Sequence, residues 1–254
     1  SYFGPPETDE HGERGLHGLI SNQRAEIESV IQPDLQRGRM EMSITGNIRE
    51  TKIFGPSFNL RRTISGKLGE PFIRIHDEVT NIGNTSTPHM ILYHCNFGWP
   101  LVDEDADILW QGSWKSGGRE SDDRIFNKNS NFRKCQPPRE DHAGRGEAVA
   151  FIDPQADASG ECECGLYNKK IGIALALRFN KKQLPCLTNW QHWGKGEYVT
   201  GLEPGTNPPS GQARARAENN LIHLEPGETR TYDLEFRIMH DEKSIHEFLK
   251  PYNL

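Results

Sequence analysis

The sequence predicts an all-β fold, and three observations carry that prediction. Short runs in which apolar and polar residues alternate dominate the chain, clusters of Gly, Pro, Asn and Asp separate these runs, and a helical pattern is confined to the C-terminal end. Alternation with a period of two is typical of strands that bury one face. Many such strands with turn residues between them indicate a sandwich or a barrel.

The alternating runs give the expected elements in order. Strands are predicted over residues 39–44, 58–64, 72–79 and 231–238. Residues 171–179 are apolar on both parities at their centre, which indicates a strand covered on both sides, in the middle of a sheet. Near the end, Asp241 or Ser244 could cap a short helix through residues 245–249 before Pro251 stops it. The polar stretch 112–159 has few alternating positions and indicates long loops around a site or a rim.

Size and charge narrow the class of protein. The chain has 254 residues and no repeat of fixed length, so we interpret residues 1–254 as one domain. Its 30 basic and 36 acidic residues give a net charge of −6, which offers no general attraction to nucleic acid or to anionic lipid. No apolar run approaches the roughly 20 residues that span a bilayer, and residues 1–6 lack the pattern of a signal peptide. The cytoplasm is therefore the default location, and the oligomeric state stays open.

The cysteines favour free thiols. Five is an odd number for a disulfide framework, so we predict no structural disulfide. Cys162 and Cys164 could supply two thiolates to a metal ion, but a closed site needs about four ligands and no second pair follows. We therefore interpret this pair as part of a turn and expect no metal.

Three segments are chemically dense, and their composition is typical of sugar recognition. They cover residues 15–22, 93–100 and 189–205, and they combine His, Asn and Glu with large aromatic side chains. Sugars are bound by aromatic faces together with a few fixed polar groups. Trp99, Trp190, Trp193 and Tyr198 could stack on a pyranose ring; the alternative is that these rings fill the core.

These segments resemble the galactose mutarotase-like superfamily, in particular a branch related to aldose 1-epimerases, over most of the chain. Leu16-His17-Gly18 is similar to a family motif whose histidine holds the sugar, and residues 92–97 (LYHCNF) are similar to the motif that contains the general acid. Residues 201–209 (GLEPGTNPP) resemble the segment that contains the general base. The resemblance implies a mutarotase-like β-sandwich, a supersandwich, and implies His94 as acid, Glu203 as base and His17 as a binding residue. The family carries several strands before its Leu-His-Gly motif and an early arginine that we cannot place here, so some N-terminal strands are expected to be missing.

We expect His17, His94 and Glu203 to converge on one cleft that binds a small sugar. Trp190 or Trp193 should form its wall with Lys195 nearby, and the remaining substrate contacts are expected from Asn96 and His192. Each assignment has a structural alternative. A histidine at a strand end is often only hydrogen-bonded, and Glu203 could simply flank a turn, as Glu225 does before Pro226-Gly227.

The predicted reaction is the exchange of sugar anomers. It requires a base for the proton of the C1 hydroxyl and an acid for the ring oxygen, so Glu203 and His94 suffice without a metal or another cofactor. No phosphate-binding loop or dinucleotide fingerprint occurs, which also favours cofactor-free catalysis. Two alternatives remain. One is a carbohydrate-binding protein without turnover, and the other is a sugar lyase that uses Tyr93 or Tyr198, with Lys195 or Arg178 for a carboxylate.

Overall fold

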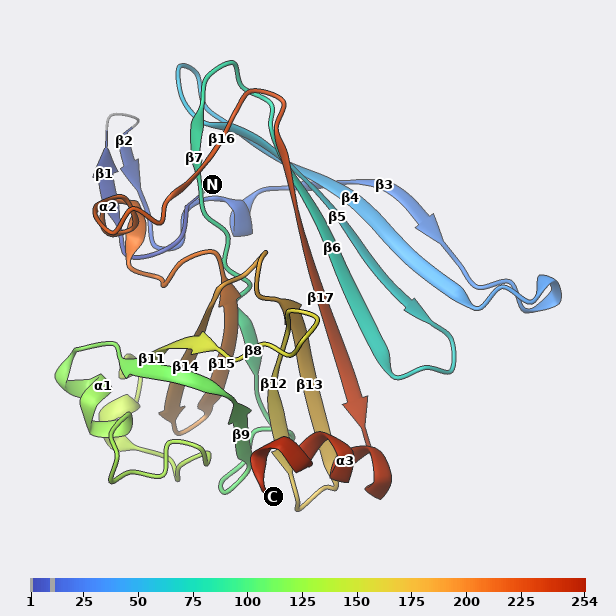
Figure 1. The fold of residues 1–254 in the computed structure, drawn as a ribbon, viewed down its shortest axis with the longest axis vertical. Coiled ribbons are helices and arrows are strands. Elements are labelled where there is room, and N and C mark those ends of the chain that lie inside the picture. Colours follow the sequence, from blue (N-terminus) through green and yellow to red (C-terminus); the bar gives the residue numbers. More distant parts are fainter. Residues whose placement is uncertain (1, 10–11) are drawn as a thin grey trace. The chain divides into compact units, whose positions relative to one another are not determined.

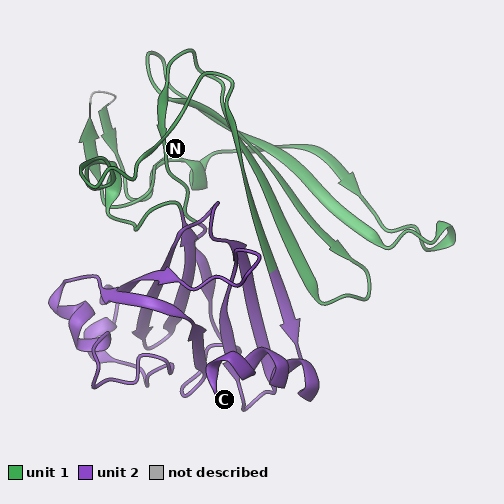
Figure 2. Ribbon diagram, viewed as in Figure 1, with its two compact units in different colours: residues 1–92, 206–235 green, residues 93–205, 236–254 purple. Residues whose placement is uncertain are grey.

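The computed structural model describes residues 2–9 and 12–254, and these form two compact units (Figure 2). Unit 1 comprises Ser1–Leu92 and Thr206–Glu235, and unit 2 comprises Tyr93–Gly205 and Phe236–Leu254. The interpretation of residues 1–254 as one domain stays a prediction. No helix in the described ranges is both long and apolar enough to cross a membrane.

Unit 1 is built on an antiparallel sheet of long strands (Figure 1). The strand order is β3 (Ala25–Ile31), β4 (Glu41–Thr51), β5 (Ser57–Lys67), β6 (Phe72–Asn81) and β17 (Thr229–Met239), of which residues up to Glu235 belong to this unit. Ile44 pairs with Ile64, and Ile64 pairs with Ile75, so the apolar positions of neighbouring strands form rows on one face. The four alternating strands that the sequence predicts are confirmed.

The smaller elements of unit 1 lie in its connections. They are β1 (Glu7–Asp9), β2 (Gly12–Arg14), η1 (Ile20–Asn22), η2 (Leu35–Arg37), β7 (Thr87–His89), α2 (Gly211–Ala217) and β16 (Ile222–Leu224). His89 on β7 is fully buried, and its Nε2 atom lies 2.7 Å from the hydroxyl of Tyr232. This histidine is a hydrogen-bonded core residue of unit 1.

Unit 2 contains two antiparallel layers (Figure 1). One layer has the order β10 (Gly112–Ser116), β11 (Ala148–Pro154), β14 (Cys186–Gly194), β15 (Glu197–Gly205) and β8 (Cys95–Phe97). The other contains β9 (Asp107–Trp110), β12 (Glu161–Asn168) and β13 (Ile173–Asn180), with β17 next to β13. The position of β13 between two strands confirms the mid-sheet strand predicted over residues 171–179.

Both layers of unit 2 bury one face. On β14 the odd-numbered residues from Leu187 to Trp193 are buried, and on β12 Cys162, Cys164 and Leu166 are buried. Large antiparallel sheets with buried inner faces are the architecture of a β-sandwich, so the predicted fold class is confirmed. Cys162 and Cys164 lie in a strand rather than in a turn, which corrects the sequence-based interpretation.

The outer face of the second layer is covered by α3 (Glu242–Leu249). The carboxylate of Asp241 accepts a hydrogen bond from the amide of Ser244 at 2.9 Å, which confirms the predicted cap. The apolar side of the helix packs on the sheet through the cluster Leu109, Ala174, Ala176, Met239, Ile245, Phe248 and Leu249. A Cβ atom at Gly165 would lie 2.8 Å from Cζ of Phe248, so this glycine lets the helix approach the sheet closely.

The prediction of long loops over residues 112–159 is partly wrong. This stretch contains β10, the short helix α1 (Glu120–Ile125), η3 (Glu140–His142) and β11. Strand β11 was missed because Ala148, Val149, Ala150, Phe151 and Ile152 are apolar on both parities, so the alternation that marks the other strands is absent. Its burial alternates nevertheless, since its two faces have different neighbours.

Candidate active site

The candidate site lies on one face of the five-stranded layer of unit 2. Gly201 on β15 pairs with Asn96 on β8 and with Trp190 on β14, and Glu203 pairs with Thr188. Directly paired residues of antiparallel strands point to the same face, and residues two apart along a strand do so as well. The side chains of Asn96, Trp190 and Glu203 therefore share this face, which is opposite to the buried face of β14.

His94 and Glu203 are in direct contact. The Nε2 atom of His94 lies 3.2 Å from Oε1 of Glu203, and the two side chains are 34% and 3% exposed. Oε1 of Glu203 is buried and has no hydrogen bond of standard geometry with the described residues. The contact with the imidazole is therefore close in distance but not aligned as a hydrogen bond. A carboxylate without solvent beside a half-exposed imidazole is an acid–base pair that a small molecule can reach from the imidazole side.

Gly201 provides the space for the Glu203 carboxylate. A Cβ atom at position 201 would lie 2.4 Å from Oε1 of Glu203 and 3.2 Å from its carboxyl carbon. Any side chain there would collide with the carboxylate, so the carboxylate lies back over the backbone of Gly201. This glycine was not among the residues predicted from the sequence.

Asn96 orients the ring of His94. Nδ1 of His94 lies 2.9 Å from Oδ1 of Asn96, and the imidazole meets Trp190 edge-on with ring centroids 5.6 Å apart and an interplanar angle of 65°. When Nδ1–H donates to this amide oxygen, Nε2 is the ring atom directed at Glu203. One hydrogen bond thus decides which nitrogen of His94 exchanges a proton with its partner.

Burial disfavours the charged form of both partners. Desolvation, with a smaller contribution from the charge of Glu147, raises the pKa of Glu203 to about 8. Desolvation also lowers the pKa of His94, against smaller opposing effects of Asn96 and Glu147. At neutral pH Glu203 is therefore protonated and His94 is neutral, so one proton is available for exchange between Oε1 of Glu203 and Nε2 of His94.

Glu147 is a further polar group of the site that sequence reasoning missed. Its Oε2 atom accepts a hydrogen bond from Nε1 of Trp190 at 2.7 Å, and its Oε1 atom accepts one from Arg119 at 2.8 Å. Desolvation alone would raise the pKa of Glu147, but the hydrogen bonds from Arg119 and Trp190 and the charge of Arg119 together lower it, so Glu147 is an anion at neutral pH. Glu147 fixes the Trp190 indole and places a negative charge near the acid–base pair.

His192 supports Trp190. Its ring stacks on the indole with centroids 5.8 Å apart and an interplanar angle of 6°. Nδ1 lies 2.5 Å from the carbonyl oxygen of Gly146, and Nε2 lies 3.2 Å from a carboxylate oxygen of Glu197. Because both ring nitrogens have partners, the contribution of His192 is to hold the aromatic wall.

The other residues that the sequence predicts for the site are Trp193, Lys195 and His17. Trp193 is fully buried on the opposite face of β14 and donates its indole N–H to Gln191, so it belongs to the core. Lys195 is exposed in the turn after β14, beyond the end of the strand that contains Trp190. His17 lies in unit 1, where Nδ1 accepts a hydrogen bond from the amide of Gly4 at 3.4 Å. Its predicted convergence with His94 stays a prediction.

Metal ligands do not gather at this site. Across residues 2–9 and 12–254, no group of three or more His, Cys, Asp or Glu side chains lies close enough to hold a metal ion. The expectation that the protein works without a metal or another cofactor stays a prediction.

Comparison with known proteins gives one family and a set of related folds. A family model described as "Domain of unknown function (DUF4432)" matches residues 1–238. No curated protein matches the chain in sequence.

Solved structures match the chain over nearly its whole length. A candidate aldose 1-epimerase from Klebsiella pneumoniae is 24% identical with a TM-score of 0.86; the match covers 98% of this chain and 63% of that protein. The chain thus spans less than two thirds of the length of this relative. A galactose mutarotase-like protein from Clostridium acetobutylicum is 14% identical with a TM-score of 0.63, covering 94% of this chain and 73% of that one. A galactose mutarotase related enzyme from Lactobacillus acidophilus is 12% identical with a TM-score of 0.59, covering 89% and 75%. The chain has the galactose mutarotase-like fold.

Proposed function

Starting from the fact that this chain belongs to the DUF4432 family and has a galactose mutarotase-like fold, we propose that it is a cofactor-independent sugar 1-epimerase. The observation that carries the proposal is the contact of 3.2 Å between Nε2 of His94 and Oε1 of Glu203, beside the partly buried ring of Trp190. A protein that only binds sugars needs an aromatic face and amides, but it has no use for a buried carboxyl group in contact with an imidazole.

The proposed reaction is ring opening and reclosure at C1. Glu203, as a carboxylate, takes the proton of the C1 hydroxyl while imidazolium His94 donates a proton to the ring oxygen, so that the bond from C1 to the ring oxygen breaks. The open-chain aldehyde rotates about its C1–C2 bond. Protonated Glu203 then returns its proton to the C1 oxygen, His94 removes the proton of the hydroxyl that attacks C1, and the other anomer forms.

The charge state of the site supports this cycle. The opened sugar requires a protonated Glu203 and a neutral His94, and burial of the two side chains favours this same pair of forms. The pair holds one proton at every stage, and only the position of that proton changes. The site is therefore suited to the open-chain intermediate, the least stable form of the sugar in the cycle.

The proposed binding contacts are Trp190 for the apolar face of the sugar and Asn96 for a hydroxyl group. The indole N–H of Trp190 is already bonded to Glu147 and one ring face stacks on His192, so the opposite ring face is the part left for a sugar. We assign the predicted sugar-holding role to His17 as part of the same proposal.

The test compares Glu203→Gln with Glu225→Gln in an anomer exchange assay. Glu225 also precedes Pro-Gly, but it lies in unit 1, is exposed and accepts a hydrogen bond from Ser86, so it is a matched control for the sequence context. Freshly dissolved free aldoses, ketoses and uronic acids are followed by polarimetry or by NMR exchange. We expect the Glu203→Gln variant to lose at least about 10²-fold in rate, because its amide cannot accept a proton, while Glu225→Gln keeps the wild-type rate.

Two outcomes would contradict the proposal. If the wild-type protein binds a sugar but accelerates no exchange beyond the buffer rate, the protein is a binder without turnover. If Glu203→Gln is as fast as wild type, the exchange does not depend on this acid–base pair.

A further inference from the structure

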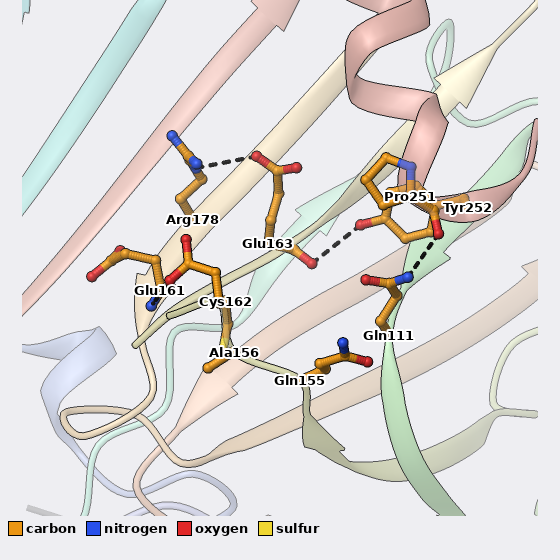
Figure 3. A pocket seen from close by; sticks show the side chains of 10 residues that line it. Gln111, Gln155, Ala156, Glu161, Cys162, Glu163, Arg178, Pro251 and Tyr252 are labelled. Atoms are coloured by element: carbon orange, nitrogen blue, oxygen red, sulfur yellow. Dashed lines mark hydrogen bonds and ion pairs between the residues drawn. The ribbon is translucent and has the colours of Figure 1, made fainter. Parts of the chain in front are cut away.

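Unit 2 contains a hollow on the opposite layer from the His94–Glu203 pair (Figure 3). It is an open cavity of about 180 Å³. The side chains that matter for its chemistry come from β12, β13, the connections before β12 and the C-terminal turn η4 (Lys250–Tyr252): Gln111, Gln155, Cys162, Glu163, Arg178 and Tyr252. At about 30 Å³ for each water, the cavity has room for roughly six waters, which is the size of a single sugar ring.

An incomplete ion pair forms one side of the cavity. Glu163 and Arg178 are paired across β12 and β13 on the face that α3 partly covers, and Nε of Arg178 lies 3.1 Å from Oε2 of Glu163. Within the described residues, the other carboxylate oxygen and the terminal guanidinium nitrogens have no further hydrogen bond. A strong acceptor and strong donors therefore lie next to each other at the cavity.

The opposite side is held in place by hydrogen bonds. Nε2 of Gln111 donates to the carbonyl oxygen of Pro251 at 2.7 Å, and the hydroxyl of Tyr252 donates to the carbonyl oxygen of Glu163 at 3.2 Å (Figure 3). These two bonds fix the C-terminal turn against the sheet. A wall that is already fixed loses little conformational entropy when a ligand binds.

The rim of the cavity is fixed as well. The carboxylate of Asp157 accepts hydrogen bonds from the amides of Ser159 and Glu161 at 2.8 and 3.0 Å. Asp157 belongs to the turn before β12, so this turn has a defined shape. Gln155 lies next to it with an exposed side chain whose amide can both donate and accept.

We propose that this cavity binds one neutral polyhydroxyl molecule, a single sugar ring or a cyclic polyol, at a site separate from the His94–Glu203 pair. Neighbouring hydroxyl groups each donate and accept, and they match the free oxygen of Glu163, the free N–H groups of Arg178 and the amide of Gln155. Tyr252 supplies an aromatic side chain for the C–H side of such a ring. The charged side chains at the cavity are Asp157, Glu161, Glu163 and Arg178, a net charge of 1 − 3 = −2, which disfavours an anionic ligand.

The test uses backbone amide shifts of the ¹⁵N-labelled full chain, since two sets of amides report on the two sites. Inositol is the first probe: it has no anomeric carbon, so no epimerase can turn it over, and free glucose and galactose follow. We expect saturable shifts of the amides of residues 155–163 and 178. Arg178→Gln and Gln155→Ala should each weaken this binding by about tenfold, the usual effect of losing a hydrogen bond to a ligand. Neither variant should change the rate of anomer exchange.

Arg74→Gln is the matched control, because Arg74 also forms an exposed ion pair with a strand carboxylate, Glu235 at 2.7 Å, but lies in unit 1. It should bind inositol as wild type does. The proposal is overturned if these amides do not respond to any of the three probes, if Arg178→Gln binds as tightly as wild type, or if a hexuronate or glucosamine binds better than inositol. Loss of exchange in Glu203→Gln with intact inositol binding separates this site from the proposed function.

Discussion

Replacing Glu203 with Gln should make the protein more stable, and the gain should depend on pH. The pKa of Glu203 is raised from the ordinary value of 4.5 to about 8 because the carboxyl group is buried. The unfolded chain ionises this group above pH 4, whereas the folded chain keeps it protonated up to about pH 8. When the pKa of an acid is higher in the folded chain than in the unfolded chain, its contribution to stability is fully present below the pKa of the unfolded chain. This contribution is lost as the pH rises through the pKa of the folded chain.

The size of the effect follows from the shift. The rise from 4.5 to about 8, at about 1.4 kcal/mol for each pKa unit, sets an upper bound of about 5 kcal/mol above pH 8. Water entry and rearrangement around an ionised carboxylate reduce this bound, so we expect a difference on the order of 3 kcal/mol at pH 9 and much less at pH 5. The amide of Gln resembles the protonated carboxyl group and carries no charge at either pH.

Urea unfolding followed by circular dichroism at pH 5, 7 and 9 measures this difference for wild type and for Glu203→Gln. Glu225→Gln serves as the control, because Glu225 is exposed. An equal difference between Glu203→Gln and wild type at pH 5 and pH 9 would mean that Glu203 titrates as an exposed glutamate does.

Three further predictions follow from the contacts of unit 2. Gly201→Ala should lower the exchange rate by about 10²-fold, because a Cβ atom 2.4 Å from Oε1 displaces the Glu203 carboxylate. The unfolding free energy should change little. A variant that exchanges anomers at the wild-type rate in polarimetry would contradict this prediction. The rate of exchange should fall above about pH 8, where the His94–Glu203 pair loses the proton that it exchanges. Glu147→Gln should shift this fall in rate to lower pH, because the negative charge of Glu147 raises the pKa of Glu203. If the pH at which the rate falls does not change in the variant, Glu147 has no such electrostatic role. Gly165→Ala should lower the unfolding free energy in urea by about 3 kcal/mol or more, since its Cβ atom would lie 2.0 Å from the carbonyl oxygen of Leu175 and 2.8 Å from Cζ of Phe248. A decrease of less than about 1 kcal/mol would mean that the sheet and α3 accommodate the methyl group by shifting.

The sequence predicts β4, β5, β6 and β17, because one buried and one polar face leave a period of two in these strands, and it predicts β13 from its continuous apolar centre. The other strands, including β12 and β14 of unit 2, were not predicted. It predicts the cap of α3 because Asp241 and Ser244 bond to each other locally. Strand β11 escaped prediction because its apolar residues occupy both parities. Features set by neighbouring residues in the sequence, such as alternating strands and a helix cap, can therefore be predicted. A strand such as β11, whose two apolar faces pack against different elements, cannot be predicted from its own residues.

The residues of the candidate site divide in the same way. His94, Asn96 and Glu203 were found through motifs, each within a few residues of sequence. Trp190 and Trp193 are three residues apart, so a strand must place them on opposite faces, a signal that was present in the sequence. Glu147 had no such signal: it reaches the site only because β11 pairs with β14, and that pairing has no local signature.

In the hairpin of β14 and β15, alternate side chains point to opposite faces of the sheet. Those on one face pack in the core, and those on the other face form the candidate site. This arrangement limits which insertions and deletions the protein can tolerate. Inserting or deleting one residue within β14 would exchange the two sets, bringing Trp193 and Gln191 to the surface and driving Trp190 and His192 inward. Such a change would cost both the fold and the acid–base arrangement. Variation in length is therefore confined to the turns, whereas within the strands new specificity can arise only by substitution, one position at a time.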